Sequence, residues 1–218
     1  MKTAKSAPSE RSPRAFKGVA RDKRSLGEFK HLLLDLLPDQ GNWGEEDYLW
    51  LTDQTNRLVE YTDGFLEPLP MPTDKHQTIL QFLFLAFRAF IARRGGKVHF
   101  AALRLQIRPG KFREPDLLLL KSATDARRSN RFWTGADLTV EVVSEEKPER
   151  DLIDKRGDYA EGKVPEYWIV NPLNDTITVL VLKRKKYAKH ATFIRGQEAT
   201  SVILPGFSVN VADVFDAD

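Results

Sequence analysis

The segment Glu114-Pro115-Asp116 leads directly into the apolar run Leu117–Leu120, and Thr139-Val140-Glu141-Val142-Val143 follows further along the chain. Both runs are typical of β-strands, because they are short and rich in Leu and Val. An Asp at the start of one strand and a Glu inside the next can lie side by side and bind a hard divalent cation through their oxygens. The two segments therefore predict a sheet that carries a nuclease-like metal site.

A helical segment follows the second strand and carries Asp151, Lys155 and Tyr159 four residues apart, which places them on one helix face. Lys155 can then reach the two acids, where a lysine orients water or stabilises charge on a phosphoryl oxygen. Each residue alone has a simpler explanation: Glu141 as an outward-facing strand carboxylate, and Lys155 as a solvated lysine paired with Asp151. Their conjunction favours a functional site, for which Glu114 is a further candidate ligand.

The composition excludes several classes of site. The 218 residues include no Cys, which excludes disulfides, thiolate nucleophiles and zinc–sulfur sites. The sequence has neither an apolar N-terminal signal segment nor a run of about 20 apolar residues, so we expect a cytoplasmic protein without a membrane span. The net charge of +3 and the pI near 9.0 permit nucleic-acid binding without requiring it.

The chain is expected to divide into a basic N-terminal tail and one folded domain. Residues 1–43 carry many Lys and Arg among Ser, Pro and Ala, with an apolar spacing around Phe29–Leu37 that is compatible with a short helix. We expect this tail to be disordered, either adding sequence-independent phosphate contacts or remaining a solvated extension. Residues 44–218 are expected to form one folded domain of catalytic size with a single core.

Turn and cap signals outline the elements of this domain. A hairpin is predicted around Asp63-Gly64, and Thr73 or Asp74 can cap a helix that runs to Ala92 before Gly95-Gly96. This helix is apolar almost all round, so we expect it to be deeply buried or covered by another subunit. Strands are predicted on both sides of the helix that carries Lys155, in the segments 98–107, 112–120, 137–143, 166–170 and 176–182.

The order of these elements predicts an α+β (mixed α/β) fold built on a mixed sheet flanked by helices. The sequence contains neither a G-x-G-x-x-G nor a Walker-type loop, which argues against a nucleotide-binding fold. It also lacks a G-x-S-x-G elbow, which argues against the triad hydrolases.

Five further residues are candidates for the site. Glu60 flanks the predicted hairpin turn, and His76 lies at the start of the long helix, where it can bind phosphate, orient water or cap the helix. Arg127, Arg128 and Arg131 lie near aromatic residues between the two acidic strands, a mixture that suits nucleic-acid contacts. A solvated loop explains these three arginines equally well.

Several of these motifs occur in an order that resembles the Uma-type family of putative restriction endonucleases, in the PD-(D/E)XK nuclease superfamily. The resemblance runs from about Gly44 to Phe215 and rests on Glu60-Tyr61-Thr62-Asp63-Gly64, His76, Pro115-Asp116, Val140-Glu141-Val142-Val143-Ser144, Asp151 with Lys155 and Tyr159, Val164-Pro165-Glu166-Tyr167-Trp168-Ile169-Val170, and Leu204-Pro205-Gly206-Phe207-Ser208-Val209. It implies a restriction-endonuclease-like mixed sheet, phosphodiester cleavage that depends on Mg²⁺ with Mn²⁺ as a substitute, and homodimers.

The sequence departs from the family's pattern at two positions. The superfamily motif places a lysine two residues after Glu141, where this chain has Val143, and the family resemblance uses Lys155 of the following helix instead. Phe65 stands where many relatives carry Glu, so the third acid is expected to be Glu60 or, failing that, Glu67.

The prediction from the sequence is a metal-dependent endonuclease that cleaves DNA. Asp116 and Glu141 are expected to hold Mg²⁺, Glu60 to add or orient a ligand, Lys155 to position the attacking water or stabilise the phosphate, and His76 to assist by hydrogen bonding. The alternatives are a catalytically inactive nuclease-like module that binds nucleic acid, and an oligomeric scaffold that uses the apolar helix.

Overall fold

The computed structural model describes residues 37–146 and 148–218. Residues Asp39–Asp218 form one compact unit. Residues 1–36 of the expected tail, and with them the helix expected around Phe29–Leu37 apart from its last residue, lie outside the described residues. The expected boundary at residue 44 is too late, because Asp39 already belongs to the compact unit and Trp43 is buried in it. Among the described residues, no helix combines the length and the apolar character needed to cross a bilayer.

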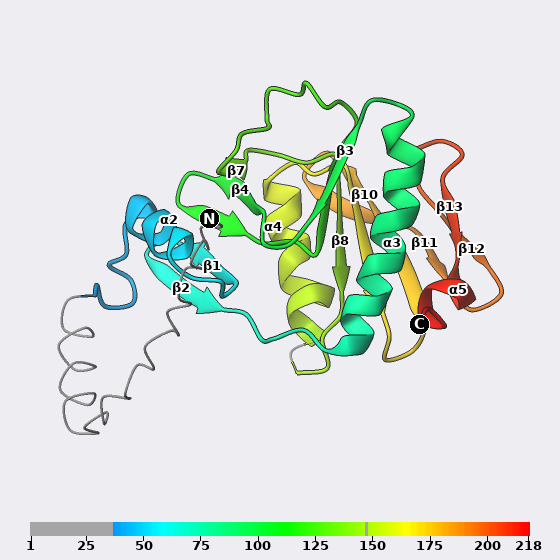
Figure 1. The fold of residues 1–218 in the computed structure, drawn as a ribbon, viewed down its shortest axis with the longest axis horizontal. Coiled ribbons are helices and arrows are strands. Elements are labelled where there is room, and N and C mark those ends of the chain that lie inside the picture. Colours follow the sequence, from blue (N-terminus) through cyan, green and yellow to red (C-terminus); the bar gives the residue numbers. More distant parts are fainter. Residues whose placement is uncertain (1–36, 147) are drawn as a thin grey trace, which may run out of the picture. The chain divides into compact units, whose positions relative to one another are not determined.

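The helices and strands of the compact unit broadly follow the predicted order, but two predicted strands are each divided (Figure 1). The segment 98–107 forms the strands Lys97–Phe100 and Arg104–Arg108 around a turn, and the segment 112–120 forms Lys111–Arg113 and Leu117–Leu120, between which Pro115 cannot donate a ladder hydrogen bond. In both cases the two strands belong to different sheets. The elements are α2 (Glu45–Asp53), β1 (Val59–Thr62), β2 (Phe65–Pro68), α3 (Asp74–Ala92), β3 (Lys97–Phe100), β4 (Arg104–Arg108), β5 (Lys111–Arg113), β6 (Leu117–Leu120), β7 (Phe132–Trp133), β8 (Leu138–Val142), the π-helical turn η1 (Arg150–Asp154), α4 (Lys155–Glu161), β9 (Glu166–Asn171), β10 (Thr176–Lys183), β11 (Lys186–Phe193), β12 (Glu198–Thr200), β13 (Ser208–Asn210) and α5 (Val211–Phe215).

The strands form mixed sheets, which confirms the predicted α+β fold class. The largest has the order β11-β10-β9-β8-β6-β3, and a second has the order β2-β1-β5-β4-β7. Within the large sheet, β8 and β9 are parallel, while β6 is antiparallel to both β8 and β3. Strands β12 and β13 form a small antiparallel pair. The parallel pair β8–β9 is connected through η1 and α4, as parallel strands require a crossover.

Helices cover both faces of the large sheet, which explains why β6, β8 and β9 are buried at every position without alternation. On one face, Leu117 and Val140 pack in a core cluster with Leu83 and Phe87 of α3. On the other face, Leu118 belongs to a second cluster that includes Tyr159 of α4. Consecutive residues of β6 thus enter different cores, which accounts for the four consecutive leucines of this strand.

The apolar helix α3 is covered mainly by the protein's own sheet. Its buried residues are Ile79, Leu80, Leu83, Phe87 and Ile91. Phe87 stacks on Phe207 with ring centroids 4.2 Å apart, and it also meets Trp168 of β9 edge to face. Leu85 is 55% exposed, so part of the helix reaches solvent. The sequence left two alternatives for α3, burial within the chain or cover by another subunit. Burial within the chain accounts for the five buried residues of the helix.

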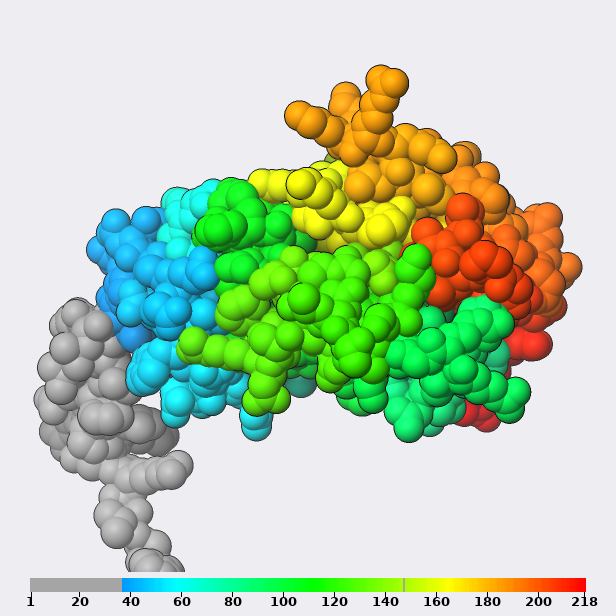
Figure 2. All heavy atoms as spheres, turned by 90° about the horizontal axis from the view of Figure 1, so that it is seen from above, coloured from blue at the N-terminus to red at the C-terminus, as the bar shows by residue number. Residues whose placement is uncertain are grey.

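The hairpin of β10 and β11 forms one edge of the large sheet. Its tip is basic and exposed, and side chains of this orange segment project from the surface in Figure 2. The four residues of the tip are Lys183, Arg184, Lys185 and Lys186. Exposed lysines at a sheet edge disfavour pairing with another edge, which is the structural role we assign to this tip.

The turn between β1 and β2 confirms the predicted hairpin and has a specific need for glycine. Asp63 and Gly64 both have positive φ, at 46° and 92°, as a type I′ turn requires. The carbonyl oxygen of Gly64 accepts hydrogen bonds from the backbone N–H groups of Gly41 and Trp43. These two hydrogen bonds hold the segment before α2 against the hairpin.

Gly64→Ala should lower the free energy of unfolding by about 2 kcal/mol or more, because a side chain at positive φ is strained. The new Cβ would also lie 2.3 Å from the carbonyl oxygen of Gly41, so the backbone contact must shift. Chemical denaturation followed by circular dichroism measures the change. Gly196→Ala is a matched control, since Gly196 also has positive φ but a methyl group added there would have no neighbouring atom within 4 Å. An equal loss in both variants would show that the Gly41 contact adds nothing.

Candidate active site

The register of β6 and β8 brings Asp116 and Glu141 to the same end of the large sheet. Leu117 pairs with Val140, so one further step of the antiparallel register places Asp116 opposite Glu141. The Oδ2 atom of Asp116 accepts a hydrogen bond from the backbone N–H of Val142 at 2.7 Å. Both carboxylates line one cavity of about 610 Å³. The structure therefore brings together the two acids that the sequence singled out.

Glu141 is buried inside β8, not outward-facing on a solvated strand, and is 1% exposed. Its Oε2 atom lies 2.8 Å from Nζ of Lys155, and its Oε1 atom accepts a hydrogen bond from the hydroxyl of Tyr159. Nζ of Lys155 also lies 3.0 Å from Oδ1 of Asp151. The predicted common face of Asp151, Lys155 and Tyr159 is confirmed, although the chain passes from the π-helical turn η1 into α4 between the first two.

Burial and neighbouring acids oppose the ionisation of Glu141. Burial raises the pKa of Glu141 well above its usual value, Lys155 lowers it, and the charges of Asp116 and Asp151 raise it again. Burial alone would lower the pKa of Lys155, but Glu141 and other acids raise it above its usual value, so the lysine is cationic. The carboxylates of Glu141, Asp116 and Asp151 repel one another, and an added cation would reduce this repulsion.

His76 supports Asp116 from the first turn of α3. The side chain of Thr73 accepts a hydrogen bond from the backbone N–H of His76 and so caps the helix. Nε2 of His76 lies 3.1 Å from Oδ2 of Asp116. Burial alone would lower the pKa of His76, but the hydrogen bond and charge of Asp116 raise it above the usual value.

The same pair lowers the pKa of Asp116. Burial alone would raise that pKa, but the hydrogen bond and charge of His76, together with Lys155 and the N–H of Val142, bring it below its usual value. Asp116 is therefore ionised and held in place. Its two hydrogen bonds both end on Oδ2, and within residues 37–146 and 148–218 none reaches Oδ1. That oxygen is available to another ligand.

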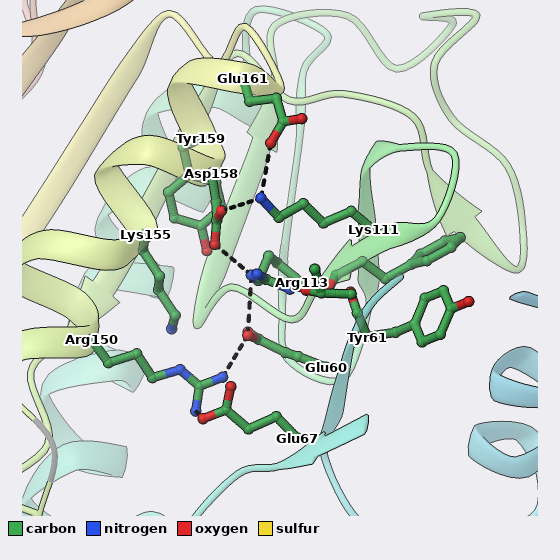
Figure 3. A network of polar contacts seen from close by, with 12 residues as sticks. Glu60, Tyr61, Glu67, Lys111, Arg113, Arg150, Lys155, Asp158, Tyr159 and Glu161 are labelled. Atoms are coloured by element: carbon green, nitrogen blue, oxygen red, sulfur yellow. Dashed lines mark hydrogen bonds and ion pairs between the residues drawn. The ribbon is translucent and has the colours of Figure 1, made fainter. Parts of the chain in front are cut away.

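Glu60 lies beside this cavity in a network of ion pairs (Figure 3). Its Oε2 atom lies 2.5 Å from a terminal nitrogen of Arg150 and 3.3 Å from Nε of Arg113, and its Oε1 atom accepts the backbone N–H of Glu114. Arg150 also pairs with Glu67 at 3.2 Å. Among the described residues, Glu60 is not part of the wall that Asp116 and Glu141 share.

The network continues from Glu60 to α4. Arg113 lies 2.7 Å from Asp158, which also pairs with Lys111, and Lys111 reaches Glu161 at the end of the helix (Figure 3). These ion pairs attach β1 and β5 to the helix that carries the lysine of the site. A second cavity of about 450 Å³ lies against this network, and both Arg150 and Lys155 line the two cavities.

The three arginines predicted to contact nucleic acid do not line the large cavity. Arg127 pairs with Asp125 and Asp137, and Arg131 pairs with Glu46 and Asp53. Arg128 is exposed and donates a hydrogen bond to the carbonyl of Ala123. The ion pairs of Arg127 and Arg131 anchor their loop to the protein and offset their charge.

Two residues that line the cavity, Arg150 and Glu114, were not predicted from the sequence as main residues of the site. Arg150 was not among the predicted site residues, and it lines the cavity from η1. Glu114 was only a spare ligand, yet it lines the cavity with its buried Oε2 atom unpartnered among the described residues. Burial, together with the charge of Glu60, raises the pKa of Glu114 to about 8. A buried polar atom without a partner marks a place where a further ligand fits.

Comparison with known proteins identifies the family. The family model described as "putative restriction endonuclease", Uma2, matches residues 45–212. The chain belongs to this family. A putative nuclease of the DUF820 family from Anabaena variabilis has a similar crystal structure, with a TM-score of 0.62 and 17% identity over 77% of this chain and 96% of the other. This likeness shows a shared nuclease-like fold. No curated protein matches the chain significantly.

The residues of this Uma2-family site fit the Mg²⁺ ion that the superfamily resemblance implies. Within the described part of the chain, no three His, Asp or Glu side chains are already arranged around a cation position. The two oxygens of Glu141 contact Lys155 and Tyr159 instead. Two carboxylates are nevertheless the protein contribution that Mg²⁺ commonly uses, with water and substrate phosphate completing the shell. The available Oδ1 of Asp116 and the unpartnered Oε2 of Glu114 match this need for oxygen donors.

Proposed function

We propose that this Uma2-family protein is a divalent-metal-dependent endonuclease that hydrolyses phosphodiester bonds in DNA. The observation that carries the proposal is the convergence of Asp116 and Glu141 in one cavity, with the buried Lys155 ion-paired to Glu141. Family membership supports a nuclease, and the carboxylate pair supports metal dependence. A cavity wall that combines acids with a buried lysine suits phosphodiester chemistry, which needs a bound cation and stabilisation of negative charge.

Asp116 and Glu141 would hold Mg²⁺, or Mn²⁺ in its place. When bound, such an ion polarises the phosphodiester and lowers the pKa of a water molecule. His76 orients the carboxylate of Asp116 through its hydrogen bond, and Tyr159 does the same for Glu141. Each carboxylate is thus held by a neighbour that restricts its rotation, as preorganised ligands require.

Lys155 is the cation that acts on the reacting groups in this proposal, because its Nζ atom lies 2.8 Å from Oε2 of Glu141. When substrate and metal occupy the cavity, its ammonium can hydrogen-bond to the attacking water or to a phosphate oxygen. Asp151 forms a second ion pair with Lys155, which would hold the amine in place if Glu141 bound a metal ion. Lys155 of α4 then supplies the positive charge that the superfamily motif places at position 143, where this chain has Val143 directly after β8.

Arg150 supplies a second positive group at the cavity, and Glu60 and Glu67 hold it. We assign Glu60 to orienting Arg150, since its oxygens accept hydrogen bonds from Arg150 and from the backbone of Glu114. Through Glu114 it also fixes a third acid of the wall. The homodimer implied by the resemblance, and phosphate contacts by Arg127, Arg128 or Arg131, remain predictions.

The test of the proposed function is cleavage by the purified full chain. Supercoiled plasmid, single-stranded DNA and RNA are each incubated with Mg²⁺, with Mn²⁺ and with EDTA. The proposal expects nicked or linear DNA with either metal and intact DNA with EDTA. Binding of nucleic acid without cleavage under every condition would instead favour the inactive nuclease-like module.

Glu60→Gln should lower turnover about ten-fold while leaving Mn²⁺ affinity within about two-fold of the wild type, because it loosens Arg150 without removing a metal ligand. Cleavage kinetics and Mn²⁺ titration are measured on the same preparation. Glu67→Gln is the matched control, since Glu67 pairs with the same arginine but is 52% exposed, and a smaller loss is expected. If Glu60→Gln weakens Mn²⁺ binding as strongly as Asp116→Asn does, Glu60 is a ligand and the positioning role is wrong.

A further inference from the structure

The large cavity has an apolar side that the chemistry of cleavage does not require. Leu69, Met71, Leu80, Phe84 and Phe100 line it together with the acids of the site. Met71 is 84% exposed and Phe100 is 53% exposed, although both are large and apolar. Exposed apolar side chains gathered at one cavity mark a surface that binds something.

The apolar side begins directly beside the carboxylates. Phe100 of β3 pairs with Leu117 of β6, and the next backbone contact joins the N–H of Ala101 to the carbonyl of Asp116. Phe84 of α3 packs against Phe100 edge to face, with ring centroids 4.8 Å apart. A phosphodiester held at Asp116 therefore has an aromatic wall within reach of its own nucleotide.

Polar groups on the same wall suit the edge of a heterocycle. Gln77 and Gln81 are one helical turn apart on α3, so they share a face, and both line the cavity. An amide carries donors and an acceptor, which is the complement of a base edge. The volume of about 610 Å³ exceeds what a cation and one phosphate group need and is within the range of sites for small organic ligands.

We propose that the apolar side of this cavity binds one unpaired nucleobase of the nucleotide next to the scissile phosphodiester, which rests on the proposed nuclease function. The base lies against Phe100, and the amides of Gln77 and Gln81 meet its edge. A base inside a duplex is covered on both faces by its neighbours, so it reaches such a wall only from a single strand or after leaving the stack. The substrate class is accordingly a single strand or a duplex with an extruded base.

Equilibrium binding without metal tests this subsite separately from cleavage. The probes are a short fluorescein-labelled oligothymidylate and a chain of the same length built from abasic deoxyribose phosphate, titrated with the full protein in EDTA. The wild type should bind oligothymidylate about ten-fold or more tightly than the abasic chain, since stacking of a base on an aromatic ring is worth that much or more. Phe100→Ala should lose this preference while binding the abasic chain as the wild type does.

Phe65→Ala is the matched control, because Phe65 is 58% exposed, like Phe100, but does not line the cavity. It should keep the full preference for bases. Equal binding of the two probes by the wild type, or an unchanged preference in Phe100→Ala, overturns the subsite. Base preference without cleavage of any nucleic acid would retain the subsite and refute the proposed catalysis, whereas cleavage without base preference would do the reverse.

Discussion

Glu141→Gln should lower the rate of phosphodiester cleavage by at least about three orders of magnitude, because it removes one of two charged metal ligands. The amide keeps the shape of the side chain and can still accept a hydrogen bond from Lys155. Single-turnover cleavage of plasmid DNA in saturating Mg²⁺ measures the loss. A variant that cuts within about ten-fold of the wild-type rate would remove Glu141 from the metal site.

The same variant separates catalysis from binding. Nucleic-acid affinity should be unchanged or higher, because a negative charge has left the cavity that receives the phosphate. The fold should persist, since Lys155 retains its ion pair with Asp151. Thermal unfolding and fluorescence anisotropy with DNA check these two expectations, and a collapse of both would make the loss of cleavage a folding defect.

Lys155→Ala should lower turnover by about 10²–10³-fold, since a charged group that stabilises the transition state is commonly worth this much. Mn²⁺ affinity should fall little or should rise, because the oxygens of Glu141 and Asp151 lose their competing cation. Some loss of stability is expected as well, because two buried carboxylates are left without their partner. Steady-state kinetics, Mn²⁺ titration and thermal unfolding are needed together.

Lys111→Ala is the matched control for this loss of stability. Lys111 also forms ion pairs with two acids, Asp158 and Glu161 of α4, but it lines neither cavity. The control should unfold at a lower temperature and cleave DNA nearly as fast as the wild type. If folded Lys155→Ala cuts as fast as the Lys111 control, the proposed role of Lys155 is wrong even where Asp116 and Glu141 prove essential.

Local sequence signals predicted the parts of the site that depend on neighbours in the chain. The turn at Asp63-Gly64 and the cap at Thr73 follow from residues that satisfy a backbone need within a few positions. The common face predicted for Asp151, Lys155 and Tyr159 is present despite a π-helical turn, because Lys155 pairs with both Asp151 and Glu141, and Tyr159 donates a hydrogen bond to Glu141. The position of Asp116 and Glu141 on neighbouring strands was predictable from the strand pattern around them, although the burial of Glu141 was not.

Contacts between distant segments could not be predicted in this way. Glu60 and Arg150 are 90 positions apart, and no local pattern couples a strand carboxylate to an arginine of η1. Burial of Glu141 depends on covering both faces of β8, whereas alternation in the sequence suggested an outward carboxylate. The lysine of the site is another contact between distant segments. The chain has Val143 where the superfamily motif has a lysine, and the amine that reaches Glu141 belongs to Lys155 of α4.

The aromatic wall also had no signal in the sequence. Phe84 and Phe100 come from a helix and an edge strand, and neither stands out among its apolar neighbours. Only the fold shows that they line the same cavity as the carboxylates. Sites assembled from several elements are therefore recognised by family resemblance or by structure, and seldom by composition.

Binding of Mn²⁺ to the full chain, measured by isothermal titration calorimetry, tests the cation site of Asp116 and Glu141 most directly. The wild type is expected to bind the ion, and Asp116→Asn and Glu141→Gln are each expected to weaken binding by at least about ten-fold, as loss of a charged ligand does. Asp213→Asn, which changes an exposed carboxylate of α5 outside the cavity, should bind as the wild type does. Absence of Mn²⁺ binding by the wild type, or unchanged affinity in Asp116→Asn and Glu141→Gln, would contradict the proposed metal-dependent nuclease.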